Sequence, residues 1–96
     1  MVTLYQAEWC PYSRRVRQRL TELGVSFAAV PVPADKVERD EMRRKTGTDE
    51  IPALLLEDGT AVAGDADEII AFLDSHYSEA ADAAEHRRQA EEHGAA

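Results

Sequence analysis

Hydrophobic residues occur along the chain in two alternating spacings, which predict strands and helices in turn. The β-branched and aromatic residues of Val2 to Gln6 are typical of a strand. Pro11 suits the first position of a helix, because its missing N–H needs no partner there. Gly24 is expected to end this helix in a left-handed conformation. The apolar residues at helical spacing between them are Tyr12, Val16, Leu20 and Leu23.

The next segment repeats the pattern of a strand followed by a helix. Val25 to Val32 has alternating apolar residues and prolines at its end, so it predicts a second strand. Asp35, with Glu38 three residues later, resembles a capping box. It predicts a helix that runs to Thr46 and stops at Gly47.

A hairpin and a last helix follow. Pro52 precedes the apolar run 53–56, and Asp58-Gly59 is typical of a two-residue hairpin turn into a strand over 60–63. Asp65 and Glu68 resemble a second capping box at the start of an amphipathic helix. The apolar residues of that helix are Ile69, Ile70, Phe72, Leu73 and Tyr77.

The predicted order is β-α-β-α-β-β-α, an α/β fold with a four-stranded mixed sheet flanked by helices. Strands joined through a helix pair in parallel, whereas the hairpin adds an antiparallel strand. Residues 1–77 are expected to form the single domain. Alanine is the only apolar residue in 78–96, an Ala/Glu-rich segment that predicts a frayed helical tail.

Composition and charge exclude several kinds of partner. The 96 residues carry a formal net charge of -8, which opposes binding to nucleic acid. No apolar run approaches the roughly 18 to 20 residues that span a bilayer. His76, His86 and His93 have no spacing that would build a metal site. We therefore expect a cytoplasmic monomer with no membrane or nucleic-acid partner.

Cys10 is the only cysteine in the chain and therefore acts as a single thiol. It lies where the first strand meets the first helix, at or next to the helix N-cap. Backbone N–H groups and the helix dipole favour a thiolate there, and can lower a cysteine pKa from about 8.5 to roughly 3.5–7.5. The plainer interpretation is a small buried hydrophobe, with solvated arginines on the helix behind it. These arginines are Arg14, Arg15, Arg17 and Arg19.

Three segments resemble the glutaredoxin family. Trp9-Cys10-Pro11-Tyr12-Ser13 is similar to the family's active-site motif Cys-Pro-Tyr-Cys, with serine in place of the second cysteine. Residues 46–52 resemble its Thr-Gly segment that ends in Val-Pro, and residues 64–69 resemble its Gly-Gly-Cys-Asp-Asp-Leu segment. The likeness covers about residues 2–77 and implies a thioredoxin-like fold of the glutaredoxin type. The first-strand and last-helix patterns are also similar to the N-terminal domains of glutathione transferases.

The resemblance implies a glutathione site facing Cys10. The proline that matches Pro52 is cis in glutaredoxins, and the backbone of the residue before it, here Ile51, pairs with the cysteinyl part of glutathione. The helix start that matches Ala66 and Asp67 binds the γ-glutamyl group, with backbone N–H groups on its carboxylate and the Asp67 side chain on its amine. Without the resemblance, Pro52 simply starts a strand and Asp67 complements a helix dipole.

Three residues depart from the family pattern for glutathione. Ala7 stands where the family has a lysine, and Asp49 and Glu50 replace polar or basic residues that meet the glycine carboxylate of glutathione. Carboxylates there would repel that group, unless Arg43 or Arg44 compensates. Glutathione and another low-molecular-weight thiol therefore both stay open as the co-substrate.

The motif match implies a catalytic site of Cys10, Pro11, Tyr12 and Ser13. Serine cannot resolve a disulfide, so the predicted activity is that of a monothiol oxidoreductase that exchanges protein mixed disulfides with a small thiol. One alternative is an iron–sulfur carrier that shares a [2Fe-2S] cluster between two subunits, although family members with that role usually have Gly-Phe in place of Pro11-Tyr12. The other alternative is a non-catalytic binding module similar to the first domain of a glutathione transferase.

Overall fold

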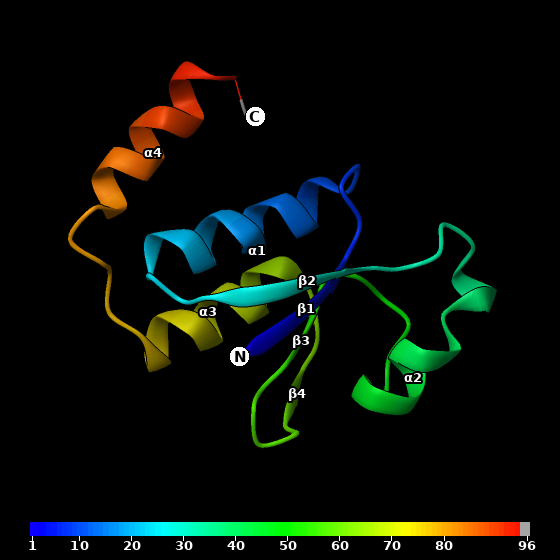
Figure 1. Cartoon of the computed structure of the whole chain (residues 1–96). Helices are drawn as coiled ribbons and strands as arrows, with labels where there is room; N and C mark the ends of the chain where they lie inside the picture. Colours follow the sequence, from blue (N-terminus) through cyan, green and yellow to red (C-terminus); the bar gives the residue numbers. More distant parts are fainter. Residues whose placement is uncertain (95–96) are drawn as a thin grey trace.

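The computed structural model describes residues 1–94, in which a mixed four-stranded sheet lies between helices (Figure 1). The strands have the order β2-β1-β3-β4 across the sheet. They are β1 (Val2–Gln6), β2 (Phe27–Pro31), β3 (Ala53–Leu55) and β4 (Ala61–Val62). The helices are α1 (Pro11–Glu22), the 3-10 helix η1 (Lys36–Glu38), α2 (Asp40–Thr46), α3 (Ala66–His76) and α4 (Ala83–Glu92).

The strand pairing confirms the predicted mixed sheet. β1 runs parallel to β2, with Val2 opposite Phe27, and antiparallel to β3, with Leu4 opposite Leu54. β4 pairs antiparallel with β3. The parallel pair needs the crossover that α1 provides, and the antiparallel pair needs only a hairpin. The order β-α-β-α-β-β-α is the thioredoxin-like arrangement.

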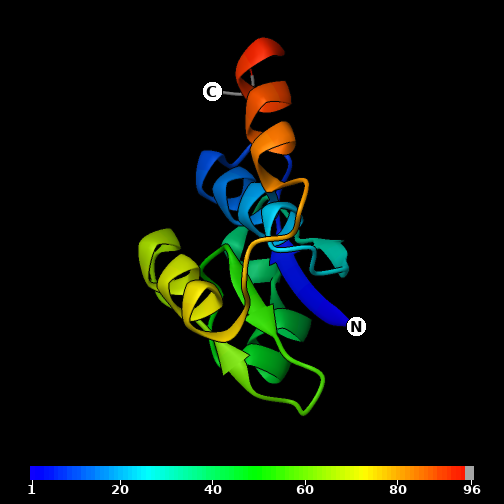
Figure 2. The ribbon, with the colours of Figure 1, turned by 90° about the vertical axis from the view of Figure 1, so that its left-hand side faces the viewer.

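The two faces of the sheet bury separate apolar clusters, because successive side chains of a strand point to opposite faces. α1 and α3 lie side by side on one face, and α2 covers the other (Figure 2). The face under α1 and α3 holds the larger cluster, which includes Leu4, Leu20, Leu54, Ile69 and Leu73. The face under α2 buries Tyr5, Met42 and Ala53.

The prediction of one continuous helix from Asp35 to Thr46 is wrong, because the structure has two short helices in this segment. Asp35 caps only the 3-10 turn η1, with its carboxylate accepting the Val37 N–H at 3.0 Å. The backbone then leaves helical geometry at Arg39, and α2 begins at Asp40. Val37, an apolar residue within the predicted helix, is exposed. The break follows from Arg39, whose side chain turns inward.

The hairpin after β3 is confirmed, but its turn is one residue longer than predicted. The Leu56 N–H donates to the Thr60 carbonyl at 2.8 Å, which leaves residues 57–59 as the loop. Gly59 takes a φ of 91°, the left-handed value that a three-residue turn with a bulge requires. The second strand is also shorter than predicted, since β2 begins at Phe27 rather than Val25.

The tail beyond α3 is helical from Ala83 to Glu92, where α4 lies against α1 (Figure 1). The buried Glu22 carboxylate at the end of α1 accepts from Arg87 at 3.0 Å and Arg19 at 2.8 Å. Glu79 accepts from the same two arginines, at 2.6 and 2.7 Å. The fraying of this tail and the domain boundary at residue 77 stay predictions, and residues 95–96 of the tail lie outside the described residues. Within residues 1–94, every helix is too short or too polar to cross a membrane.

Candidate active site around Cys10

The thiol of Cys10 caps the N-terminus of α1. Its backbone is extended (φ -83°, ψ 118°), as an N-cap residue requires, and Pro11 occupies the first helical position. The Ser13 N–H donates to Cys10 Sγ at 3.4 Å. The Cys10 N–H in turn donates to the Ala7 carbonyl at 3.1 Å, which closes the turn between β1 and α1. The local sequence therefore holds the sulfur at the positive end of a helix, as predicted.

The surroundings of Cys10 lower its pKa below that of an ordinary cysteine thiol. Burial is the largest single effect and opposes the shift, because it disfavours the charged thiolate. Hydrogen bonds from the Ser13 hydroxyl and from the Ser13 and Tyr12 backbone N–H groups outweigh burial, and the positive charge of Arg17 adds to them. These groups favour the thiolate, which is the nucleophilic form of cysteine, although little of the side-chain surface meets solvent.

Ser13 has a structural as well as an electrostatic place in the site. The side chain is fully buried beneath the start of α1. Its Oγ accepts the buried Ala7 N–H at 3.4 Å, which ties the helix to the end of β1. Serine in the position of a second cysteine therefore supports both the thiolate and the turn that carries it.

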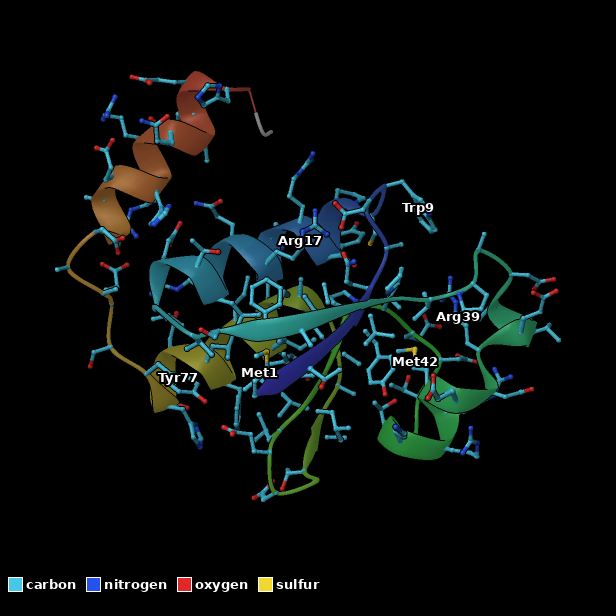
Figure 3. The ribbon with its side chains drawn as sticks, viewed as in Figure 1. Met1, Trp9, Arg17, Arg39, Met42 and Tyr77 are labelled. Carbon is cyan, nitrogen blue, oxygen red and sulfur yellow. The ribbon has the colours of Figure 1, made fainter. Side chains whose placement is uncertain are left out.

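Two aromatic side chains flank Cys10 on the outside of the molecule. Trp9 is 67% exposed and points away from the sheet (Figure 3), and Tyr12 is 58% exposed. Tyr12 was expected on the apolar face of its helix and instead faces solvent. Pro11 is exposed as well. The rim around the sulfur is therefore apolar and accessible.

An open pocket of about 370 Å³ lies next to Tyr12. Its walls come from the segment before β3 and the start of α3; the lining residues are Tyr12, Thr48, Glu50, Ile51, Pro52, Gly64, Asp65 and Ala66. The Ile51–Pro52 peptide bond is cis, as the resemblance implied. Gly64 has a φ of 121°, and a Cβ there would meet a Glu68 side-chain oxygen at 2.9 Å. Cys10 is not among the lining residues, but Tyr12 connects it to the pocket.

The start of α3 forms one wall of this pocket and is capped as predicted. Asp65 Oδ1 accepts the Glu68 N–H at 2.8 Å, and Ala66 is buried. Asp67, proposed to meet an amine, is exposed and forms an ion pair with Arg15 of α1. An incoming amine would share the Asp67 carboxylate with that guanidinium.

Neighbouring cations partly offset the two carboxylates that depart from the family pattern. Arg43 Nη1 donates to Asp49 Oδ2 at 2.9 Å, so one of the two arginines expected to compensate does so. Glu50 pairs with Lys36, a partner that the sequence did not suggest. The pairs with Asp40 and Asp49 raise the pKa of Arg43, which stays charged. The local field at this end of the pocket is therefore less negative than the sequence implies.

Two further residues at the site were missed from the sequence. The charge of Arg17 helps to lower the Cys10 pKa, and its guanidinium bonds to Gln6, with Nη1 also 3.5 Å from the Ala7 carbonyl. Arg39 is buried behind the pocket wall. Neither pattern nor charge distinguishes them from surface arginines. Within residues 1–94, no group of three or more His, Cys, Asp or Glu side chains could hold a metal ion.

Comparison with known proteins agrees with this geometry. Residues 4–81 match the family described as glutathione S-transferase, N-terminal domain. Glutaredoxin 3 of Escherichia coli K12 is 32% identical over 56 residues, which cover 58% of this chain and 68% of that protein.

Solved structures of glutathione transferases have the same fold. Glutathione transferase E6 of Drosophila melanogaster superposes with a TM-score of 0.69 at 26% identity, over 83% of this chain and 36% of its own. A glutathione S-transferase of Methylobacterium radiotolerans, in complex with glutathione sulfonate, superposes with a TM-score of 0.68 at 31% identity. The match covers 79% of this chain and 35% of the transferase chain. The chain thus spans about a third of these transferases. Together the matches show that it belongs to the glutathione S-transferase N-terminal domain family, among the glutaredoxin-like proteins of the thioredoxin fold.

Proposed function

We propose that the chain is a monothiol, glutaredoxin-like thiol–disulfide oxidoreductase that acts on mixed disulfides through Cys10. The observation that carries this proposal is the single thiol at the N-cap of α1, with a lowered pKa and an exposed aromatic rim. A structural cysteine would be inert and would lack such stabilisation of its thiolate. The lone cysteine suits a reducing compartment, so we place this activity in the cytoplasm.

The proposed cycle has two exchanges and one covalent intermediate. The Cys10 thiolate attacks the small-thiol sulfur of a protein mixed disulfide, so that a bond forms between Cys10 Sγ and the small thiol. The protein sulfur leaves as a thiolate and takes a proton from water. A second small thiol, as its thiolate, then attacks the bound one and leaves with it as a disulfide, which regenerates the Cys10 thiolate.

Glutathione is the small thiol that we propose. Support comes from the glutathione transferase relative with bound glutathione sulfonate and from the pocket beside Tyr12 and Pro52. The pocket is large enough for a peptide-sized ligand and has the start of α3 on one wall. The pairing of Asp49 and Glu50 with Arg43 and Lys36 removes part of the repulsion toward a carboxylate.

The test is turnover of a small glutathione mixed disulfide, with oxidised glutathione measured through its reductase. Native protein and Cys10→Ser are compared, with Ser26→Ala as a control at an exposed site. We expect turnover that the Cys10→Ser substitution abolishes and the control leaves unchanged. Cysteine and coenzyme A replace glutathione in parallel reactions. If the folded native protein shows no turnover with glutathione, cysteine or coenzyme A, the proposed activity is overturned.

A further inference from the structure

Arg39 is a buried arginine that the proposed mechanism does not use. Only 5% of its surface is exposed, although it lies between the short helices η1 and α2. It is on the α2 side of the sheet, close to Met42 and away from α1 (Figure 3). A charged side chain is rarely buried this far without a specific partner.

The guanidinium of Arg39 donates to three backbone carbonyls from two separate segments. Nε donates to the Pro33 carbonyl at 2.8 Å and Nη2 to the Ala34 carbonyl at 3.3 Å. These two carbonyls belong to the loop that follows β2. Nη1 donates to the Asp49 carbonyl at 2.9 Å. Arg39 therefore links the loop after β2 to the segment that leads into the Ile51–Pro52 bond.

These contacts use the shape of arginine rather than its charge. Within residues 1–94, no carboxylate accepts a hydrogen bond from Arg39, and its partners are neutral carbonyl oxygens. Only a planar guanidinium presents donors in a fixed fork that can reach two chain segments at once. Burying a cation is costly unless its donors are satisfied, so the geometry of these carbonyls is tightly defined.

The Asp49 carbonyl belongs to the chain segment that forms one wall of the pocket beside Tyr12, although Asp49 itself does not line it. Thr48, Glu50 and Ile51, the residues around it, all line that pocket. Two other cations reach this segment through its side chains: Lys36, which is half exposed, pairs with Glu50, and Arg43 pairs with Asp49. Arg43 also donates to the Lys36 and Val37 carbonyls at 3.0 and 2.7 Å, which lie outside the segment. Solvent weakens such exposed pairs. The Thr46 hydroxyl also contacts this backbone, with its Oγ1 3.0 Å from the Thr48 carbonyl. The buried link through Arg39 is the contact that joins the backbone of the segment to the loop after β2.

We propose that Arg39 is a positioning residue for thiol exchange at Cys10. It touches neither Cys10 nor the pocket, and it acts by holding residues 48–51 where the small-thiol part of the mixed disulfide binds. This inference rests on the proposed function. Loss of the link should lower the affinity for the mixed disulfide while the reactivity of the thiol itself stays the same.

The experiment compares Arg39→Ala and Arg39→Lys with the native protein in the mixed-disulfide assay. Arg88→Ala is the matched control, because Arg88 is an exposed arginine of α4 that does not line the pocket. Each variant is measured for KM and kcat, for the pH profile of Cys10 alkylation, and for hydrogen–deuterium exchange of residues 48–51. Arg39→Lys keeps the positive charge but lacks the planar guanidinium that reaches both segments. It is the variant to be measured if Arg39→Ala does not fold.

We expect the Arg39 variants to raise KM on the order of tenfold, since small displacements remote from the chemistry have large kinetic effects. The alkylation profile should match that of the native protein, exchange at 48–51 should accelerate, and Arg88→Ala should change none of these. A purely structural role would reduce the folded fraction and apparent kcat with KM unchanged, and this result would overturn the proposal. Unchanged exchange at 48–51 would overturn it as well. Absence of turnover in the native protein would instead reject the proposed function, and the inference with it.

Discussion

Removal of the Ser13 hydroxyl is the most direct perturbation of the candidate site. Ser13→Ala deletes one oxygen from a fully buried side chain and leaves Cys10, Pro11 and the helix in place. Two hydrogen bonds depend on that oxygen. It accepts the buried Ala7 N–H at 3.4 Å, and it donates to the Cys10 thiolate.

The two losses predict separate magnitudes. A buried N–H that loses its acceptor lowers the free energy of unfolding by about 1–3 kcal/mol. Because this bond is long, we expect a decrease near the lower end of that range, about 1 kcal/mol. For a chain of this size that corresponds to a Tm lower by roughly 4–8 °C. The pKa of Cys10 should rise toward its ordinary value, because the hydroxyl is the largest of the effects that lower it.

Urea unfolding at pH 7 gives the first quantity, and the rate of iodoacetamide alkylation as a function of pH gives the second. Ser26→Ala is the control, because Ser26 is exposed in the loop before β2. We expect both measurements to change in Ser13→Ala and neither to change in the control. If the alkylation rate of Ser13→Ala has the same midpoint pH as that of the native protein, the argument that the Ser13 hydroxyl stabilises the thiolate is refuted.

Four further predictions test other parts of the structure. Because folding lowers the Cys10 pKa, its thiolate stabilises the fold at alkaline pH, and this contribution is lost as pH falls through the lowered pKa. The stability difference between native and Cys10→Ser, from urea unfolding, should therefore increase with pH up to about 9.0. Arg87→Ala should release α4, because Arg87 bonds to Glu22 and Glu79, and limited proteolysis within residues 77–82 should accelerate. The same bonds, with those of Arg19, lower the Glu79 pKa to about 2, so acid should release α4 in native protein between pH 4.5 and about 2. Leu54→Ala should cost about 2–5 kcal/mol of unfolding free energy, because Leu54 is fully buried between the sheet and its helices; a cost below 1 kcal/mol would contradict this placement.

The hydrophobic pattern predicted the sheet and the main helices because apolar residues report burial directly. Leu4, Leu20, Leu54 and Leu73 lie in the core beneath α1 and α3. The N-cap position of Cys10 was also predictable, since Pro11 marks the first turn of a helix.

Buried polar side chains account for most of what the pattern missed. Arg39 looks like a surface residue in sequence, yet it is buried at the break in the predicted helix and donates to the Asp49 carbonyl. Glu22 is buried and attaches α4 to α1 through Arg87. The sequence pattern did not predict this attachment, because alanine is the only apolar residue in 78–96. The Glu22–Arg87 pair joins residues 65 positions apart, and Arg39 bonds to backbone carbonyls, so the spacing of apolar residues reveals neither contact.

Gly64 limits which sequences can retain this pocket. Its backbone conformation, with a φ of 121°, is one that residues with a side chain rarely adopt, and the nearest oxygen of Glu68 would lie 2.9 Å from an added Cβ. A library randomised at position 64 and selected for folding should consequently return glycine almost alone. Because Gly64 also lines the pocket, this edge of it consists of bare main chain, and substitutions that reshape it for a different thiol are restricted to the other positions of the wall.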